Sequence, residues 1–154
     1  MSNFEPLWLK EQIMHCLNVD KMFSPDGDLI RSNVGELGEN ILTNILEHKG
    51  IPFHTEDELR ELNFHKTPDV RLEIPIAVKG RIVHWIESKA LFGDYYHHKK
   101  YDEAQYSSYY NRYGPGLVIY WAGYIKELEE CQDFLVLHDF PRDEDIEVIK
   151  SPFL

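Results

Sequence analysis

Two strand-like segments joined by a very short turn constrain the fold more than any other feature of the sequence. Residues 70–78 and 81–90 are rich in apolar and β-branched side chains, and Lys79 and Gly80 lie between them. A two-residue connection containing glycine suits a tight turn between antiparallel strands, whereas parallel strands need a much longer crossover. The chain must therefore contain a sheet, and its other segments must cover that sheet.

The segments around this hairpin alternate between helix and strand patterns. Residues 33–49 carry apolar side chains at steps of three and four, and Gly50 follows, which predicts an amphipathic helix. A second helix is expected over residues 98–113, because the Gly-Pro-Gly sequence 114–116 then stops it. Residues 117–124 are apolar on both faces, which is typical of a buried central strand. The shorter predictions are a strand at 51–54, a helix at 55–62 and a strand at 134–140. This order predicts an α/β fold with a mixed sheet flanked by helices.

The length and composition indicate one folded domain. The chain has 154 residues, of which 43% are hydrophobic, enough for one packed core. We expect this domain at residues 33–154, preceded at 1–32 by an N-terminal extension or capping helix with a turn at 25–28. The sequence has neither an apolar run that could span a membrane nor a secretory signal, so we expect an intracellular protein. Cys16 and Cys131 form no CxxC pair and are expected to be unpaired thiols.

The net charge of −11 is unusual for a nucleic-acid binder, because contacts to phosphate groups need cations. The acidic side chains are concentrated towards the ends of the chain, above all at 127–147, while residues 60–112 hold a small excess of basic side chains. The middle of the chain could therefore face a polyanion. The acidic ends would then restrict which substrates approach.

An acid at the start of the first hairpin strand and a charged triplet at the end of the second are the most informative residues. Asp69 follows Pro68, and Glu87 and Lys89 flank Ser88. Because side chains alternate along a strand, Glu87 and Lys89 share one face. Taken separately, these features are usually a turn and a solvated strand face. Here the triplet ends a mostly apolar strand, where unpartnered charges are costly, so we expect the three charged groups to converge.

Two carboxylates together with water suit Mg²⁺, with Mn²⁺ as a substitute, because these ions prefer hard oxygen ligands. The expected ligands are Asp69, Glu87 and the carbonyl oxygen of Ser88. Such an ion supplies a water of lowered pKa and offsets charge that develops on a phosphate. Lys89 would hold or help to deprotonate the attacking water. Glu39, on the first predicted helix, either binds a second ion or orients water, or is simply an exposed helix carboxylate.

Polar side chains on the second predicted helix extend the candidate site. Gln105 and Tyr109 are four residues apart and share a face, so they could hydrogen-bond a phosphate or the metal-bound water. An ordinary polar helix face is the alternative. The remaining candidates, either for contact with a nucleic-acid backbone or only for solvation, are His97, His98, Lys99, Lys100 and Arg112.

A regular hairpin would not bring the two acids together. With a two-residue turn at Lys79 and Gly80, Glu87 pairs with Leu72, which leaves Asp69 on the opposite side of the sheet. We therefore predict an irregularity between Asp69 and Pro75, because proline interrupts the ladder of hydrogen bonds.

Three strings of residues resemble a known family. KTPD at 66–69, HWIESKALFGD at 84–94 and NRYGPGLVIYW at 111–121 are similar to the codanin-interacting nuclease family, which is also described by its Thr-Pro-Asp motif. That family is a branch of the PD-(D/E)xK nuclease superfamily, and the Gln105 and Tyr109 pair looks like a variant found in its helicase-associated exonucleases. The resemblance covers residues 33–140. It implies a restriction-endonuclease-like αβββαβ core.

The resemblance also implies a function. It implies Mg²⁺-dependent hydrolysis of phosphodiester bonds, with DNA favoured over RNA and branched or flapped DNA as candidate substrates. It names Asp69, Glu87 and Lys89 as the catalytic set, with Glu39 and Gln105 as supports. A codanin-like protein partner, a nuclear and cytoplasmic location and, by analogy with the fold, a homodimer are further expectations.

The alternative to a nuclease is an adaptor that keeps the fold without hydrolysis and binds a protein partner. The net charge favours the adaptor, whereas the intact acids and lysine favour the nuclease. The aromatic residues that an adaptor would use are Tyr95, Tyr96, Tyr106, Tyr110 and Trp121.

Overall fold

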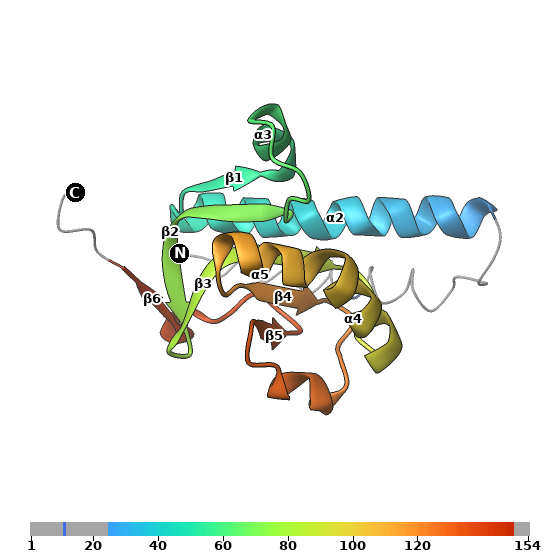
Figure 1. The fold of residues 1–154 in the computed structure, drawn as a ribbon. Helices are drawn as coiled ribbons and strands as arrows, with labels where there is room; N and C mark the ends of the chain where they lie inside the picture. The colour runs from blue at the N-terminus through green and yellow to red at the C-terminus, as the bar shows by residue number, and fades with distance from the viewer. Residues whose placement is uncertain (1–10, 12–24, 150–154) are drawn as a thin grey trace.

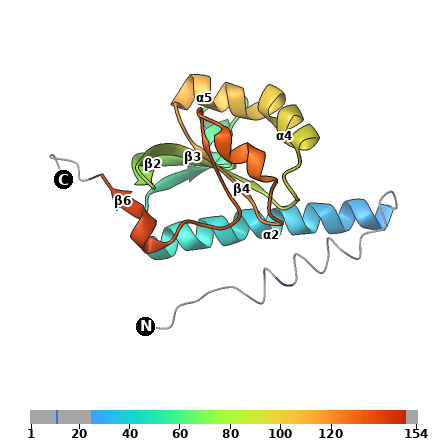
Figure 2. The same cartoon turned by 90° about the horizontal axis from the view of Figure 1, so that it is seen from below.

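A six-stranded mixed sheet forms the centre of the molecule, with helices on both of its faces (Figures 1 and 2). The computed structural model of the protein describes residue 11 and residues 25–149. Helix α2 (Pro25–Lys49) crosses one face, and the segments α4 (Tyr95–Tyr101) and α5 (Ser107–Tyr113) cover the other. None of the described helices is both long and apolar enough to span a membrane. The prediction of an α/β fold with a mixed sheet between helices is confirmed.

The strands lie at β1 (Phe53–Thr55), β2 (Val70–Val78), β3 (Arg81–Lys89), β4 (Leu117–Tyr120), β5 (Leu135–Leu137) and β6 (Ile146–Val148). Their order across the sheet is β1-β2-β3-β4-β5, and β6 pairs with β2 beside the hairpin turn. The pairs β1 to β2 and β2 to β3 are antiparallel, while β3 to β4 and β4 to β5 are parallel. Strand β6 was not predicted, because its short acidic sequence has no strand pattern of its own.

Helix α2 begins earlier than predicted. The predicted turn at 25–28 was wrong, because the helix starts at Pro25 rather than at Asn33. Proline fits the first turn of a helix, where its missing N–H would have no partner in any case. The helix consequently runs without interruption through residues 32 and 33, where the two predicted segments met.

Short helices connect the strands. Helix α3 (Glu56–Glu61) begins with the predicted capping box, in which Thr55 accepts from the N–H of Glu58 and the Glu58 carboxylate accepts from the N–H of Thr55. The acidic segment after β4 forms a 3-10 helix, η2 (Lys126–Glu130), and another one, η3 (Asp143–Asp145), precedes β6.

The single helix predicted at 98–113 consists of three consecutive segments. Helix α4 starts earlier, after Asp94, whose carboxylate accepts from the N–H of His97 and caps the helix. A π-helical turn, η1 (Asp102–Tyr106), follows it and leads into α5. Such a turn adds a residue to the helix and changes which side chains face the sheet.

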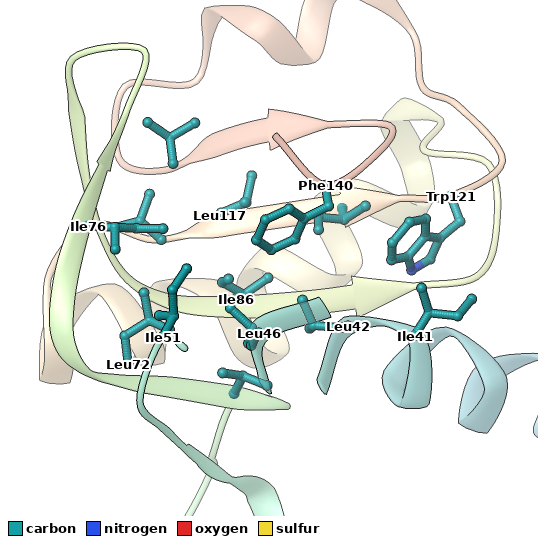
Figure 3. Close-up of a cluster of buried hydrophobic side chains, with 14 of the residues drawn as sticks. Ile41, Leu42, Leu46, Ile51, Leu72, Ile76, Ile86, Leu117, Trp121 and Phe140 are labelled. Carbon is teal, nitrogen blue, oxygen red and sulfur yellow. The ribbon is translucent and has the colours of Figure 1, made fainter. Parts of the chain in front are cut away.

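The two faces of the sheet are packed with different side chains. The face under α2, called here the aliphatic face, is built mainly from Ile41, Leu42, Leu46, Leu72, Ile86 and Leu117 (Figure 3). The face under α4 and α5, called the aromatic face, is built mainly from Trp85, Tyr106, Tyr109, Tyr120 and Phe134. Strand β4 serves both faces, since its residues alternate between the two clusters and all of them are buried.

The hairpin has the predicted irregularity. Close to the turn, Ile76 pairs with Val83, whereas Arg71 pairs with Trp85, so the register shifts between Arg71 and Ile76. At the far end Val70 pairs with Ile86. Continuing that register by one residue sets Asp69 opposite Glu87. The shift therefore moves Asp69 onto the face of the sheet that carries Glu87.

Candidate active site

The two acids of the hairpin meet at the start of β2 and the end of β3. The backbone N–H of Asp69 donates to Oε2 of Glu87 at 3.1 Å, and the backbone N–H of Ser88 donates to Oδ2 of Asp69 at 2.7 Å. Each carboxylate is thus held by the backbone of the other strand. Asp69 and Glu87, called here the acid pair, come together as the sequence predicted.

Lys89 lies beside the acid pair on the same face. Its Nζ is 3.0 Å from Oε1 of Glu87 and donates to Oε1 of Gln105 at 2.9 Å. The ammonium group also lies 4.4 Å from the ring centroid of Tyr101. The sequence therefore correctly placed Glu87 and Lys89 on one face, and it correctly brought Gln105 to the site.

Burial gives the acid pair an unusual charge balance. Only 3% of Glu87 is exposed, and burial raises its pKa although Lys89 acts in the opposite direction. The pKa of Asp69 lies well above its usual range, first because of burial and then because of the negative charges of Glu87 and Glu39. The site thus concentrates more negative charge than one lysine balances.

Glu39 faces this site from α2. Partial desolvation raises the pKa of Glu39, the Glu56 carboxylate raises it further, and the positive charge of Lys89 lowers it. These influences place Glu39 within electrostatic reach of both Lys89 and the acid pair. Glu39 has no hydrogen bond to the acid pair within the described part of the chain.

A glycine that the sequence reading did not single out brings α2 close to the site. A Cβ added at Gly38 would lie 3.0 Å from Oγ of Ser88 and 3.2 Å from Nε1 of Trp121. The helix backbone therefore packs tightly against β3 at the residue before Glu39. Nε1 of Trp121 donates to Oγ of Ser88 at 2.8 Å and fixes that side chain on the aliphatic face. A glycine inside a helical pattern was the available signal, because it weakens a helix unless close packing requires it.

Tyr109 closes the site from α5. It is buried, and its ring contacts Trp85 edge to face at a centroid distance of 5.2 Å. Burial raises the pKa of Tyr109, and the charges of Glu87 and Asp69 raise it further, so its hydroxyl stays neutral near the acid pair. Gln105 thus contributes to the site by accepting a hydrogen bond from Lys89, and Tyr109 contributes a neutral hydroxyl within electrostatic reach of the acid pair.

The predicted basic contacts lie in different environments. Lys99 and Lys100 are exposed on α4, and in the described part of the chain their side chains make no hydrogen bond or ion pair with the acids. The guanidinium of Arg112 donates to the backbone carbonyl of His65. His98 was wrongly placed among the solvent-facing candidates, because it is buried and its Nδ1 lies 2.8 Å from the hydroxyl of Tyr120.

The donor chemistry of the acid pair fits a magnesium ion. Within residues 25–149, no three side chains of His, Cys, Asp or Glu gather closely enough to hold a metal by themselves. Mg²⁺ requires less, since it usually binds through one or two carboxylates and keeps water or substrate oxygens as its other ligands. Asp69 and Glu87 supply such oxygens, and burial is the main reason why the pKa of each carboxyl is raised.

Part of the predicted adaptor surface is wrong. Tyr106 and Trp121 are buried in the two cores and cannot bind a partner. Tyr95 and Tyr96 are 65% and 69% exposed, and Tyr110 is 37% exposed, so these three remain on the surface. Cys131 is a free thiol as expected, whereas Cys16 lies outside the described residues.

Comparisons with known proteins agree with the family resemblance. A family described as "Protein of unknown function TPD sequence-motif" matches residues 6–140. The protein named CDAN1-interacting nuclease 1 from Mus musculus is 44% identical over 137 residues, which cover 88% of this chain and 49% of the mouse protein. Its counterpart from Homo sapiens is 46% identical over 121 residues, covering 79% and 43% of the two chains. That from Danio rerio is 46% identical over 140 residues, covering 89% and 46%.

The chain spans about half the length of these curated relatives. No solved structure matches it. The Thr-Pro-Asp motif that names the family ends at Asp69, one member of the acid pair. Because the family match covers most of the sequence, the chain belongs to the family of proteins with the TPD sequence motif.

Proposed function

We propose that this chain is a Mg²⁺-dependent nuclease that hydrolyses phosphodiester bonds of DNA, including branched or flapped DNA. The observation that carries the proposal is the meeting of Asp69, Glu87 and Lys89 across an irregular hairpin. The names of the relatives support it, since each of them is called a nuclease. We also propose a restriction-endonuclease-like core, because the order helix, strand, strand, strand, helix, strand runs from α2 to β4 once the short helix α3 between β1 and β2 is set aside.

The carboxylates of Asp69 and Glu87 would hold the ion, with the carbonyl oxygen of Ser88 as a further ligand. When bound, the ion supplies a water of lowered pKa and offsets negative charge on the phosphate. Glu39, whose charge acts on the pKa of Asp69, would orient that water from α2. The backbone N–H groups of Asp69 and Ser88 keep the two carboxylates in place before substrate arrives.

Lys89 would act on the attacking water and the phosphate. Glu87 and Gln105 hold its ammonium group from two sides, so the third N–H is free to donate to a water or a phosphate oxygen. A cation fixed in a buried site stabilises the charge that develops during hydrolysis more strongly than a cation in water. Gln105 would thus position Lys89 by accepting its hydrogen bond and would not itself take part in the reaction.

The test compares cleavage by the full chain, two variants of the candidate site and two control variants. Labelled linear, flapped and four-way DNA and RNA are incubated with Mg²⁺, Mn²⁺ or EDTA. Both Asp69→Asn and Lys89→Ala should slow metal-dependent cleavage by about 10²-fold to 10³-fold, the usual cost of removing one such group. Asp133→Asn and Lys126→Ala are matched controls, because both side chains are exposed away from the acid pair. Equal cleavage by all five proteins would show contamination and contradict the proposal.

A protein partner is a second candidate function. The relatives are named for an interaction with CDAN1, and Tyr95 and Tyr96 are exposed at the start of α4. A chain that binds a codanin-like protein but cleaves no nucleic acid with either metal would favour the adaptor over the nuclease. Replacing both tyrosines by serine should then weaken that complex and leave the fold intact.

A further inference from the structure

We propose that Arg71 and Arg112, called here the arginine pair, bind a backbone phosphate of the nucleic-acid strand next to the bond that is cleaved. The proposal rests on the proposed function and extends it to the way the substrate is held. Arg112 was already a candidate contact, whereas nothing in the sequence singled out Arg71. Three features of the structure support this role, namely position, charge and unpartnered hydroxyls.

The first feature is the position of Arg71 in β2. Arg71 pairs with Trp85, and the same register sets Asp69 opposite Glu87. Side chains two residues apart in a strand point to the same face, about 7 Å from each other. Arg71 therefore lies beside the acid pair on the aromatic face. One nucleic-acid strand could contact both Arg71 and the acid pair.

Arg112 comes to the same place from α5. The Cζ atoms of Arg71 and Arg112 lie 5.1 and 5.8 Å from the ring centroid of one side chain, Tyr113. Arg112 also donates to the carbonyl of His65, which ties the end of α5 to the loop before Asp69. Phe64 in that loop packs on Tyr113 with centroids 6.5 Å apart. The exposed Arg112 is thus held beside this loop by its hydrogen bond to His65 and its contact with the Tyr113 ring.

The second feature is charge. In the described part of the chain, neither arginine forms an ion pair with a carboxylate, although the protein carries a net charge of −11. Both guanidinium groups lie close to the Tyr113 ring, at 5.1 and 5.8 Å from its centroid, so an anion bound beside this ring would be attracted by both. Arginine suits phosphate in particular, because its planar group offers five N–H donors and Arg112 uses only part of them on His65.

The third feature is a pair of buried hydroxyls without partners. Among the described residues, the Tyr113 hydroxyl and Oγ1 of Thr67 are buried and have no hydrogen-bond partner. Tyr113 is the side chain under the arginine pair, and Thr67 belongs to the loop that Arg112 holds. Buried polar groups are nearly always satisfied, so unpartnered ones often mark a place where a ligand or water completes the structure.

A nucleic-acid strand explains these features better than an acidic protein segment. The arginine pair lies on the face and at the end of the hairpin where the acid pair would cleave a phosphodiester. A strand held there at one phosphate places the next phosphates over the neighbouring residues. Lys66, exposed in the same loop, extends the basic surface outward.

The experiment measures binding and cleavage separately on the full chain. Fluorescence anisotropy with a labelled DNA strand in EDTA reports binding without metal-dependent cleavage. Arg71→Gln and Arg112→Gln should each weaken binding about tenfold, the loss of one charge-assisted contact. Each should also reduce the slope of log affinity against log salt by about 1. In Mg²⁺, Arg112→Gln should raise KM and leave kcat nearly unchanged, because the neighbouring phosphate does not itself react and is bound equally before and during the reaction.

Two further variants separate charge from packing. Arg142→Gln removes one positive charge from a side chain that is 83% exposed and should bind DNA as the wild type does. Arg112→Lys keeps the charge without the planar group and should restore part of the affinity. If Arg71→Gln lowers the melting temperature strongly, the binding and cleavage measurements on Arg112→Gln alone decide the proposal, because Arg112 is exposed.

The outcomes distinguish the two proposals. Equal DNA affinity for Arg112→Gln and Arg142→Gln, with intact cleavage, overturns the role of the arginine pair and leaves the nuclease standing. Lost affinity in Arg112→Gln with no cleavage by any protein supports the arginine pair and refutes the nuclease. Binding of a poly-glutamate peptide but not of DNA would overturn the arginine pair as a nucleic-acid contact.

Discussion

The two faces of the sheet differ in chemistry as well as in position. The aliphatic face packs branched side chains from α2 against the sheet. The aromatic face packs tyrosines and a tryptophan, whose polar tips and ring faces can contact charged groups. Glu87, Lys89 and Asp69 all point to the aromatic face. One face mainly stabilises the fold, and the other tolerates the buried charges that chemistry needs.

A buried hydrogen-bond chain shows how the aromatic face accommodates polar groups. Nδ1 of His98 lies 2.8 Å from the Tyr120 hydroxyl, which is 3.1 Å from the Tyr106 hydroxyl. Burial lowers the pKa of His98, which favours the neutral imidazole, and burial raises the pKa of Tyr106, which keeps it neutral. The polar atoms under α4 are thus satisfied without adding charge beside Lys89.

The largest expected effect tests the aliphatic face. Leu46→Ala removes a fully buried side chain and should lower the free energy of unfolding by about 2 to 5 kcal/mol, because a cavity remains. Urea denaturation followed by circular dichroism measures this loss. Leu29→Ala on the same helix is the control, since Leu29 is 62% exposed and its removal should cost less than about 0.5 kcal/mol. If folded Leu46→Ala also lost cleavage, the two faces would not be separable.

A smaller effect of opposite sign is expected on the aromatic face. Asp69→Asn keeps an oxygen that can accept from the N–H of Ser88 but removes the charge of a partly buried carboxylate beside Glu87. The free energy of unfolding in EDTA at neutral pH should therefore rise by about 0.5 to 2 kcal/mol, the usual range of a stabilising substitution. Denaturation beside Asp133→Asn, which removes an exposed charge, measures the gain.

The pH dependence follows from the raised pKa of Asp69. A carboxyl whose pKa is higher in the folded than in the unfolded state stabilises the fold below its ordinary pKa of 3.8. That stability is lost as the pH rises through the folded value, because the unfolded chain releases its proton first. The difference between Asp69→Asn and the wild type should thus be small in acid and grow with pH. If the stability difference between Asp69→Asn and the wild type shrank as the pH rises, the ionised Asp69 carboxylate would not be unfavourable in the folded protein.

The smallest expected effect concerns the ring beside Lys89. Tyr101→Leu removes a ring whose centroid is 4.4 Å from Nζ of Lys89, a contact worth about 0.5 to 1 kcal/mol at a partly exposed site. Cleavage should slow about twofold to fivefold through kcat. Tyr101→Phe keeps the ring and should cleave at the wild-type rate. Equal rates for the leucine and phenylalanine variants would show that packing alone, and not the aromatic face, holds the lysine.

Local patterns predicted most elements because they depend on near neighbours in the chain. The hairpin strands at 70–78 and 81–89, the capping box at Thr55 and the buried strand from Leu117 follow from alternation, capping and apolar runs. The π-helical turn at 102–106 and the start of α2 at Pro25 did not follow. Both depend on how a helix packs against the sheet, which short-range patterns do not record.

The candidate site divides in the same way. The spacing of Glu87 and Lys89 was enough to place both on one face, and the mismatch of a regular hairpin was enough to require a register shift. The contact of Tyr101 with Lys89 and that of Arg71 with Tyr113 could not be foreseen, and Gly38 was signalled only as a glycine inside a helical pattern. Each joins segments that are far apart in the sequence, so only packing brings them together.

The sequence by itself determined that Asp69, Glu87 and Lys89 belong to one hairpin and that Glu87 and Lys89 share a face. The reason is that the alternation of side chains along a strand is a property of the backbone. Only the tertiary structure decided that Glu87 is buried and that Asp69 and Lys89 are partly buried on the aromatic face, with α2 brought close at Gly38. Burial changes the free energy of a charge far more than its neighbours in sequence do. The sequence therefore determined which acids and which lysine share the strand pair, whereas the packing around these side chains determined their pKa values and their partners.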